Sequence, residues 1–166
     1  MKRIISLCAA AVLCLSLLSA CGGKPAEEKK VDLAAFAQEV MANHEFSALE
    51  KADPADQEVG AIMLENNYPG LKDMDLEQAE IYLAMISFSG GELALAQAKS
   101  AEDAAKVKGI FESRIEAKTT EGPGNYPEEV ELWLHSAKVA EHGTYVMLVN
   151  HPDSEAIVSE FEALFK

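Results

Sequence analysis

Cysteine is scarce in this chain of 166 residues, which has three, at positions 8, 14 and 21. All three lie in or directly after an N-terminal apolar segment, and residues 31–166 contain none. A disulfide framework, a zinc site built from thiolates and a cysteine nucleophile are therefore excluded for that segment. Its fold must be stabilised by packing alone, and a segment of this size can bury a sufficient core.

Basic residues are also few, with 14 lysines and arginines against 28 aspartates and glutamates, and the net charge is -14. Nucleic acid is excluded as a partner, because phosphate binding requires clusters of Lys and Arg. Removal of an N-terminal leader that contains Lys2, Arg3 and no acid would change the charge from -14 to -16. Because such a charge repels an anionic membrane surface, we expect the folded segment to stand away from the lipid.

The chain contains no recognisable catalytic motif. A Gly-x-Ser-x-Gly sequence is absent, and no arrangement of Ser, His and Asp indicates a catalytic triad. His44-Glu45 is similar to the start of a zincin motif, but the second His that this motif needs four residues after the first is absent. We therefore interpret His44 as a solvated residue at the end of a helix.

The N-terminus carries the clearest chemical signal in the sequence. Lys2 and Arg3 precede the apolar run 4–17, and the small residues Ser19 and Ala20 lie directly before Cys21. This is the pattern of a secretory signal peptide. The sequence Leu18-Ser19-Ala20-Cys21 resembles the bacterial lipobox, in which the Cys thiol is alkylated with diacylglycerol and the peptide before it is removed.

These features predict the organisation of the chain. We expect a lipoprotein signal peptide at 1–20, lipidation of Cys21, a flexible tether over 21–30 and a single domain at 31–166. A retained transmembrane helix is the alternative, but the apolar run is shorter than the roughly 20 residues that a span needs. The lipid on Cys21 would hold the protein at the extracytoplasmic face of the cell membrane.

Hydrophobic periodicity predicts two short helices at the start of the domain. The stretch 32–41 is typical of a one-faced helix, with apolar residues at Leu33, Phe36, Ala37, Val40 and Met41. Further on, Asp53-Pro54 is typical of an N-cap followed by proline at the first helical position. It predicts a second helix that continues to about Glu65.

The sequence pattern in the second half of the chain predicts two similar units, each a hairpin followed by a helix. In the first unit, strands at 80–88 and 93–98 flank a turn at 89–92, and Ser100 caps a helix. In the second unit, strands at 130–140 and 145–150 flank a turn at 142–143, and a helix follows Pro152-Asp153. A loop over 119–129 joins the two units.

These elements together predict an α+β fold. Two hairpins supply a four-stranded antiparallel sheet, and the helices that follow them each carry one apolar stripe. The simplest way to bury both stripes is to place the helices on one face of the sheet. The N-terminal helices would precede this core.

Several short segments resemble one known family. They are residues 91–96, the alanine-rich helix that follows them, Tyr126-Pro127-Glu128-Glu129, and Gly143-Thr144-Tyr145-Val146. Together they resemble a family of lipoproteins from low-GC Gram-positive bacteria that is defined by a domain of unknown function, DUF4358. The resemblance covers about residue 76 to the C-terminus. It implies a place at the outer face of a Gram-positive cell membrane, and it implies no activity and no catalytic residue.

Three histidines in the last third of the chain, His135, His142 and His151, suggest a metal cluster at first sight. If residues 142–143 form the hairpin turn, the register places His151 opposite Leu134. The side chains of His135 and His151 then point to opposite faces of the hairpin. We therefore predict no shared metal ion, and we interpret His142 as solvated.

Two further segments are similar to ligand sites but have structural explanations. Residues 73–77 alternate acids as a calcium loop does, yet the Gly and Glu that complete such a loop are absent, and Asp75 with Gln78 fits a helix cap better. The Ser-Gly-Gly sequence at 89–91 has no adjacent Lys or Arg to hold a phosphate, so it favours a tight turn.

Glu128, Glu129 and Glu131 lie close to Trp133 in the sequence. Paired carboxylates beside a ring that stacks on sugars are typical of glycosidases. Acids are abundant throughout this chain, however, so we interpret this group as a solvated entry to a strand with Trp133 in the core.

The sequence therefore predicts a non-enzymatic, monomeric lipoprotein that needs no cofactor. We expect it to bind a partner protein, a peptide or a small solute at the cell envelope, or to serve as an accessory subunit there. The alternative is an envelope hydrolase that uses carboxylates. A deep pocket lined by Glu128, Glu131 or His135 would favour that alternative.

Overall fold

The computed structural model describes residues 29–53, 56, 58–84, 91–120 and 126–166. The predicted signal peptide, Cys21, most of the predicted tether, Pro54 and the Ser89-Gly90 turn lie outside the described residues. Among the helices that are described, none is both long enough and apolar enough to cross a membrane.

The centre of the fold is an antiparallel sheet, which confirms the predicted α+β class. Its strands follow the order β1-β2-β3-β5-β4. The sheet has five strands, not the four predicted. Strand β1 was not predicted because it is only three residues long and its sequence has no apolar alternation. The strands are β1 Leu49–Lys51, β2 Leu76–Ala84, β3 Glu92–Ala98, β4 Ala137–His142 and β5 Tyr145–Asn150.

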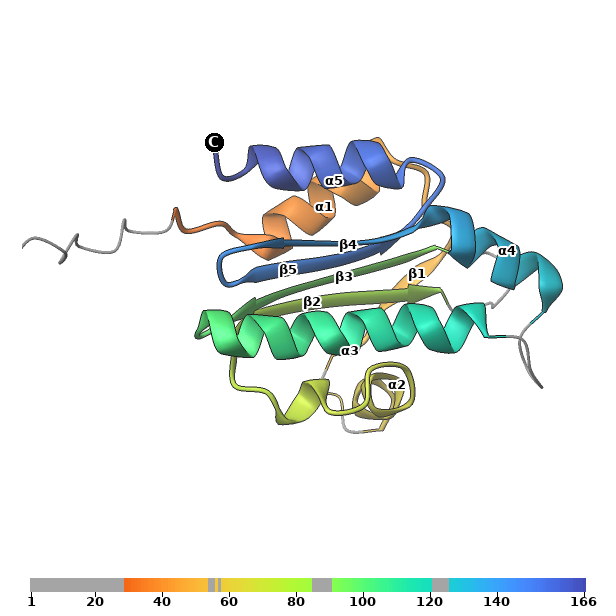
Figure 1. Ribbon diagram of the computed structural model, residues 1–166, viewed down its shortest axis with the longest axis horizontal. Helices are drawn as coiled ribbons and strands as arrows, with labels where there is room; N and C mark the ends of the chain where they lie inside the picture. Colours follow the sequence, from red (N-terminus) through yellow and green to blue (C-terminus); the bar gives the residue numbers. More distant parts are fainter. Residues whose placement is uncertain (1–28, 54–55, 57, 85–90, 121–125) are drawn as a thin grey trace, which may run out of the picture.

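Helices cover both faces of the sheet, so the prediction that they share one face is wrong. Figure 1 shows α1 and α5 on one side of the strands and α3 with α2 on the other, while α4 lies at one end. A 3-10 turn, η1, leads from α2 into β2. The bounds are α1 Leu33–Asn43, α2 Gly60–Asn67, η1 Leu71–Asp73, α3 Ala101–Thr119, α4 Pro127–Ser136 and α5 Ser154–Ala163.

The central strands explain why two layers of helices are needed. All six residues of β5 are buried, and so are six of the seven residues of β3. Ala94 and Ala96 belong to the core beneath α3, whereas Leu93 and Leu95 belong to the core beneath α1 and α5. Because side chains alternate along a strand, helices on one face alone would leave one of these apolar rows in water.

Three predicted helices are confirmed by their caps or their buried stripes. The Asp32 side chain accepts from the Ala35 N–H at 3.0 Å at the start of α1. Ser100 caps α3 as predicted, since its hydroxyl accepts from the Asp103 N–H at 3.1 Å. The buried faces of α1 and α5 consist of Leu33, Phe36, Ala37 and Val40 on the former, and Ser154, Ile157 and Phe161 on the latter.

The predicted N-cap of the second helix at Asp53 is wrong, because α2 begins at Gly60. Asp56 holds the chain in a turn before the helix, as its side chain accepts from the N–H groups of Glu58 at 3.0 Å and Val59 at 3.2 Å. A Cβ atom on Gly60 would lie 1.9 Å from the Asp53 carbonyl oxygen, so this contact requires glycine.

The predicted helix cap at Asp75 is also wrong, because Leu76 begins strand β2. Asp75 instead forms an ion pair with Lys99 at 2.6 Å. Gln78, in the strand, donates from its side-chain amide to the Val31 carbonyl at 2.8 Å. Asp75 therefore contacts the residue that follows β3, and Gln78 contacts the segment before α1. Neither residue starts a helix.

The strand predicted at 130–140 is wrong over most of its length, because helix α4 occupies it. Pro127, Glu128 and Glu129 lie in the first turn of α4. A proline followed by acidic residues is a favourable composition for the N-terminus of a helix. Val130 and Trp133 are buried three residues apart, as helical spacing requires. Only the residues from Ala137 onward form β4.

The second hairpin turns one residue later than predicted. His142 pairs with Tyr145, so Gly143 and Thr144 form the turn. Gly143 has a φ of 58°, a left-handed conformation that glycine adopts without strain. Each hairpin leads into a helix as expected, β2–β3 into α3 and β4–β5 into α5, but the helices lie on opposite faces of the sheet.

Candidate functional site

A cavity of about 380 Å³ opens at the edge of the sheet beside β2. Its apolar lining comes from α2, η1 and the strand itself. Leu64, Leu71 and Ile81 are buried there, and Met74 and Leu76 are partly buried. The volume lies within the range of ordinary ligand pockets, about 300–1,000 Å³.

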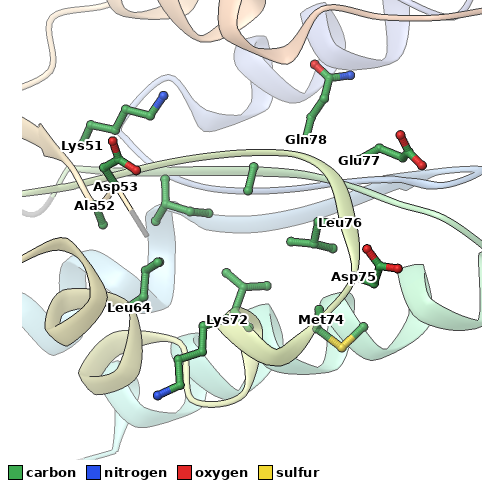
Figure 2. Close-up of a pocket in the computed structure, with 13 residues that line it drawn as sticks. Lys51, Ala52, Asp53, Leu64, Lys72, Met74, Asp75, Leu76, Glu77 and Gln78 are labelled. Carbon is green, nitrogen blue, oxygen red and sulfur yellow. The ribbon is translucent and has the colours of Figure 1, made fainter. Parts of the chain in front are cut away.

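Polar side chains surround this cavity, as Figure 2 shows. Leu64 lies on one side of the β2 ribbon, and Lys51 and Gln78 lie on the other. Asp75 and Glu77 are exposed at the end where β2 begins. The cavity therefore combines an apolar floor with a rim that is acidic at one end.

Strand β1 covers only part of the neighbouring edge of β2. It pairs with Tyr82–Ala84, and one further bond runs from the Ala52 N–H to the Ile81 carbonyl at 2.9 Å. The Asp53 N–H then donates to the Lys51 carbonyl at 3.1 Å, which takes the chain off the ladder. Beyond Asp53, β1 no longer covers the edge of β2.

The first half of β2 presents backbone groups at this uncovered edge. The Ile81 carbonyl faces β1, and because backbone groups alternate along a strand, the N–H and C=O of Ala79 face the same side. No strand in the described part of the chain pairs with Leu76–Glu80 on that side. An extended peptide could bind to this edge directly above the cavity.

A second candidate site is a buried network around Glu92 at the start of β3. The Arg114 guanidinium binds this carboxylate with two N–H groups, at 3.0 and 2.8 Å, and the Tyr68 hydroxyl donates to the same carboxylate. The side chains of Arg114 and Glu92 are only 10% and 4% exposed. The guanidinium also lies over two rings, Tyr68 at 5.8 Å and Trp133 at 5.3 Å.

A second buried ion pair lies beside this network. Lys118 on α3 donates to the Oε1 atom of Glu129 on α4 at 2.6 Å. Among the described residues, the other oxygen of that carboxylate, Oε2, has no hydrogen-bond partner. Both ion pairs line a cavity of about 120 Å³, which suits a few water molecules or a very small polar ligand.

The electrostatics of the network follow from burial. Burial raises the pKa of the Tyr68 hydroxyl well above its usual value, and the neighbouring Glu92 carboxylate raises it further. Tyr68 therefore stays protonated and acts as a hydrogen-bond donor. Burial alone would lower the pKa of Arg114, but its hydrogen bonds to Glu92 and the negative charges of Glu92 and Glu129 together outweigh that effect, and the net shift is upward. Both upward shifts favour the protonated forms of Tyr68 and Arg114, which therefore act as hydrogen-bond donors to Glu92.

A third cluster joins two histidines that are distant in sequence. His44 follows α1, and His151 and Asp153 lie in the turn between β5 and α5. His44 Nδ1 is 3.3 Å from Asp153 Oδ2, and its Nε2 is 3.2 Å from Glu160 Oε1. His44, His151 and Asp153 each offer a ligand atom, and these atoms all lie within 4.8 Å of one another.

Most site residues that the sequence suggested do not come together. His135 lies exposed on α4, where it pairs with Glu131 at 3.3 Å. His142 is at the end of β4 and stacks on Phe165, with ring centroids 4.1 Å apart. The interpretation of His44 as a solvated residue is wrong, since its side chain is only 10% exposed.

The carboxylates near Trp133 have separate environments. Glu128 and Glu131 are exposed, whereas Glu129 is buried in its pair with Lys118. Trp133 is buried as predicted, but on a helix and against Arg114. These acids do not form a matched pair beside an open ring.

Sequence reasoning missed Glu92, Arg114 and the pairing of His44 with His151. Glu92 is the last residue of the turn predicted at 89–92, where an exposed side chain is expected. Arg114 is the only arginine after Arg3, and a lone arginine on a helix surrounded by acids was a signal that could have been followed. The meeting of His44 and His151 depends on which face of the sheet α1 covers, which no local pattern reports.

One comparison with known proteins identifies the domain family that the sequence resembles. No curated protein and no solved structure matches the chain significantly. The model of a domain of unknown function, DUF4358, matches residues 50–151, which run from β1 to the end of β5. This segment contains the edge cavity and the Glu92 network, and it leaves out His44 and Asp153. Because the match covers more than half of the sequence, the chain belongs to the DUF4358 family.

Proposed function

We propose that this protein is a lipid-anchored, extracytoplasmic binding module that receives an extended peptide segment of an envelope protein. The lipobox at residues 18–21 supports the anchor, with Cys21 as the lipidated residue. The tether over 21–30 and the acidic charge of the chain support a domain, residues 31–166, that stands away from the membrane surface. The protein acts as a monomer and binds no nucleic acid, and its peptide-binding role needs no cofactor.

The uncovered edge of β2 above the apolar cavity is the observation that carries this proposal. Ala79 offers an N–H and a C=O at the edge, and Leu64 and Leu76 offer apolar surface directly beneath. A bound strand gains affinity from main-chain hydrogen bonds and specificity from pockets that take alternate side chains. The edge of β2 provides the main-chain groups, and the cavity beneath it provides the pocket.

The lining also indicates the chemistry of the peptide. An apolar side chain suits the floor formed by Leu64, Leu71 and Ile81, all buried residues. The exposed Glu77 favours a basic residue next to it, and the net charge of -14 favours a basic partner in general. We therefore propose an extended segment with an apolar residue flanked by Lys or Arg.

Photo-crosslinking in intact cells tests this function. A photoreactive amino acid at Glu77, beside the edge, is compared with the same amino acid at Glu162, an exposed position on α5. We expect crosslinks to a discrete envelope protein from the first position only, through an extended segment rich in basic residues. The substitution Ala79→Pro removes the outward N–H and should abolish them. Equal crosslinking from both positions would contradict the proposal.

The carboxylate-dependent hydrolase is the alternative function, and no specific observation favours it. Glu131 and His135 lie on the exposed side of α4, with side chains 69% and 78% exposed. The cavity next to this helix is lined by Glu129, whose charge is already paired with Lys118.

A further inference from the structure

His44 and His151 direct the same ring nitrogen toward one carboxylate oxygen. The Nδ1 atoms of the two rings lie 3.3 Å and 3.9 Å from Asp153 Oδ2. The three donors form a set of two imidazoles and one carboxylate, which is typical of sites for zinc and other first-row transition metals.

The other nitrogen of each ring already has an acceptor. His44 Nε2 is 3.2 Å from the Glu160 carboxylate, and His151 Nε2 is 3.2 Å from the Glu45 carbonyl oxygen. Ligating histidines usually donate their second N–H to a carboxylate or a backbone carbonyl, which fixes the tautomer. Both kinds of outer partner are present here, on the side of each ring that faces away from Asp153.

The hydrogen bonding of His151 identifies its tautomer. The Asp153 N–H donates to His151 Nδ1 at 3.0 Å, so this nitrogen carries a lone pair and the proton lies on Nε2. A metal ion would take the place of this N–H as the partner of the lone pair. Replacement of this N–H by a metal ion would cost the hydrogen bond between Asp153 and His151. It would keep the His151 ring in the same orientation.

Two of the three donor separations are close to those of a tetrahedral site, and the ligand atoms of the two histidines lie within 4.8 Å of each other. Ligands at about 2.0–2.1 Å from a zinc ion lie roughly 3.3–3.4 Å from one another in tetrahedral geometry. The distance of 3.3 Å from His44 to Asp153 agrees with this value, and the 3.9 Å distance from His151 is longer by 0.6 Å. A small shift of the exposed Asp153 side chain closes that difference.

Burial and access also suit a metal site. The side chains of His44 and His151 are 10% and 7% exposed, whereas that of Asp153 is 59% exposed. The histidines are therefore held in place by their surroundings while the carboxylate side is open to solvent. A surface cavity of about 480 Å³ lined by both His151 and Asp153 borders the cluster.

From this geometry we propose that His44 Nδ1, His151 Nδ1 and Asp153 Oδ2 bind a divalent transition-metal ion such as Zn²⁺, with a fourth position open to water. Glu160 and the Glu45 carbonyl orient the two rings. The ion links the end of α1 to the turn before α5, two segments more than a hundred residues apart in the chain. This site is separate from the β2 edge, and it replaces the metal-free expectation that rested on His135, His142 and His151.

Metal titration of the full chain tests the site. Cys8, Cys14 and Cys21 are changed to Ser so that no thiol competes, and the chain in detergent is titrated with Zn²⁺ by calorimetry and with Co²⁺ by absorption. We expect one equivalent of each ion. His151→Gln and Asp153→Asn should weaken binding by more than the roughly 10–100-fold that loss of an outer partner causes, and Glu160→Gln by about that amount.

The matched controls are His135→Gln and His142→Gln, which should leave the affinity unchanged because these rings lie elsewhere. Asp153 is exposed, so Asp153→Asn keeps the test valid if a buried histidine variant fails to fold. Nitrogen NMR of the imidazoles should show the metal on Nδ1 and the proton on Nε2. Absence of binding at micromolar Zn²⁺, or binding that survives both His151→Gln and Asp153→Asn, would show that His44 only bridges two carboxylates and would overturn the proposal.

Discussion

Glu92 is the residue whose role differs most between sequence and structure. In the sequence it follows a glycine pair and suggests a solvated turn, yet it is 3% exposed and bound by both Arg114 and Tyr68. A buried carboxylate is tolerable only when its charge is paired and its oxygens accept hydrogen bonds. The pair therefore fixes how α2 and α3 meet the start of β3.

Removing one member of this pair should be costly. We expect Arg114→Met to lower the free energy of unfolding by about 3–5 kcal/mol, because Glu92 would stay buried without its counter-ion. The double variant Glu92→Gln, Arg114→Met should lose less than the sum of the two single variants. Denaturant titration measures all of these values.

The control for that cycle is Lys106→Met, also on α3. Lys106 pairs with Glu102 and Asp103 but is 54% exposed, so its loss should lower the unfolding free energy far less than the loss of Arg114 does. Equal losses for Arg114→Met and Lys106→Met would show that the buried network does not stabilise the fold.

Tyr68 gives the molecule a dependence on alkaline pH. Its pKa in the folded state is raised by burial and by Glu92 above the usual value of 10.0, which applies in the unfolded chain. The stability that this difference contributes is fully present below that pH and is lost as the pH rises above it. We expect the unfolding free energy to fall above this pH, and to fall less steeply in Tyr68→Phe.

Absorbance titration of the tyrosinate band checks the same point directly. The burial of Tyr82 and its bond to Glu80 also raise the pKa of that hydroxyl, so Tyr68 and Tyr82 should both ionise above the usual pKa of 10.0. Ionisation of Tyr68 at its usual pKa while the protein is still folded would contradict its buried environment.

At the scale of single elements, Gly60 and Gly109 form a matched pair. Both lie in helices, but a Cβ atom at Gly60 would overlap the Asp53 backbone, whereas nothing lies within 4 Å of the Cβ position at Gly109. We expect Gly60→Ala to destabilise the protein by about 1–3 kcal/mol or more. Gly109→Ala should stabilise it by about 0.5–1 kcal/mol, since glycine is a poor helix former.

Thermal and denaturant unfolding of the two variants decides this prediction. If Gly60→Ala were neutral or stabilising, the start of α2 would not lie against Asp53, and the correction of its N-terminus from residue 53 to residue 60 would have to be withdrawn.

Helices with a single apolar stripe could be predicted from sequence. Helices α1, α3 and α5 are of this kind, and side-chain caps at Asp32 and Ser100 support the first two. Helix α4 was missed because Val130 and Leu132 also fit the alternation of a strand. In the fold Leu134 is 56% exposed while Trp133 is buried, a pattern that helical spacing explains.

The placement of helices on the sheet could not be predicted, because it depends on which row of side chains each strand offers. Strands β3 and β5 are apolar on both faces, so the sequence allows either face for any helix. The same limit hid the histidine cluster, since His44 meets His151 only when α1 and α5 share a face. The edge cavity was also hidden, because it depends on where the short β1 ends.

At the scale of the whole molecule, anchoring by Cys21 is a prediction from sequence alone. We expect a fatty-acid analogue to label the protein in cells, and the mature N-terminus to be Cys21. Cys21→Ala should abolish the label, whereas Cys14→Ala, inside the leader, should retain it. Label that persists in Cys21→Ala would contradict the lipobox and favour a retained N-terminal helix.

The central claim is that the edge of β2 receives an extended peptide. NMR of the isotope-labelled full chain in detergent, with a short synthetic peptide that carries one Leu between Lys residues, tests it most directly. The account predicts that chemical-shift changes centre on Ala79 and Glu77, and that the Ala79 amide becomes protected from hydrogen exchange. A control peptide N-methylated along its backbone should bind far more weakly. Shift changes confined to other faces, or an Ala79 amide that exchanges as fast with the peptide as without it, would contradict the claim.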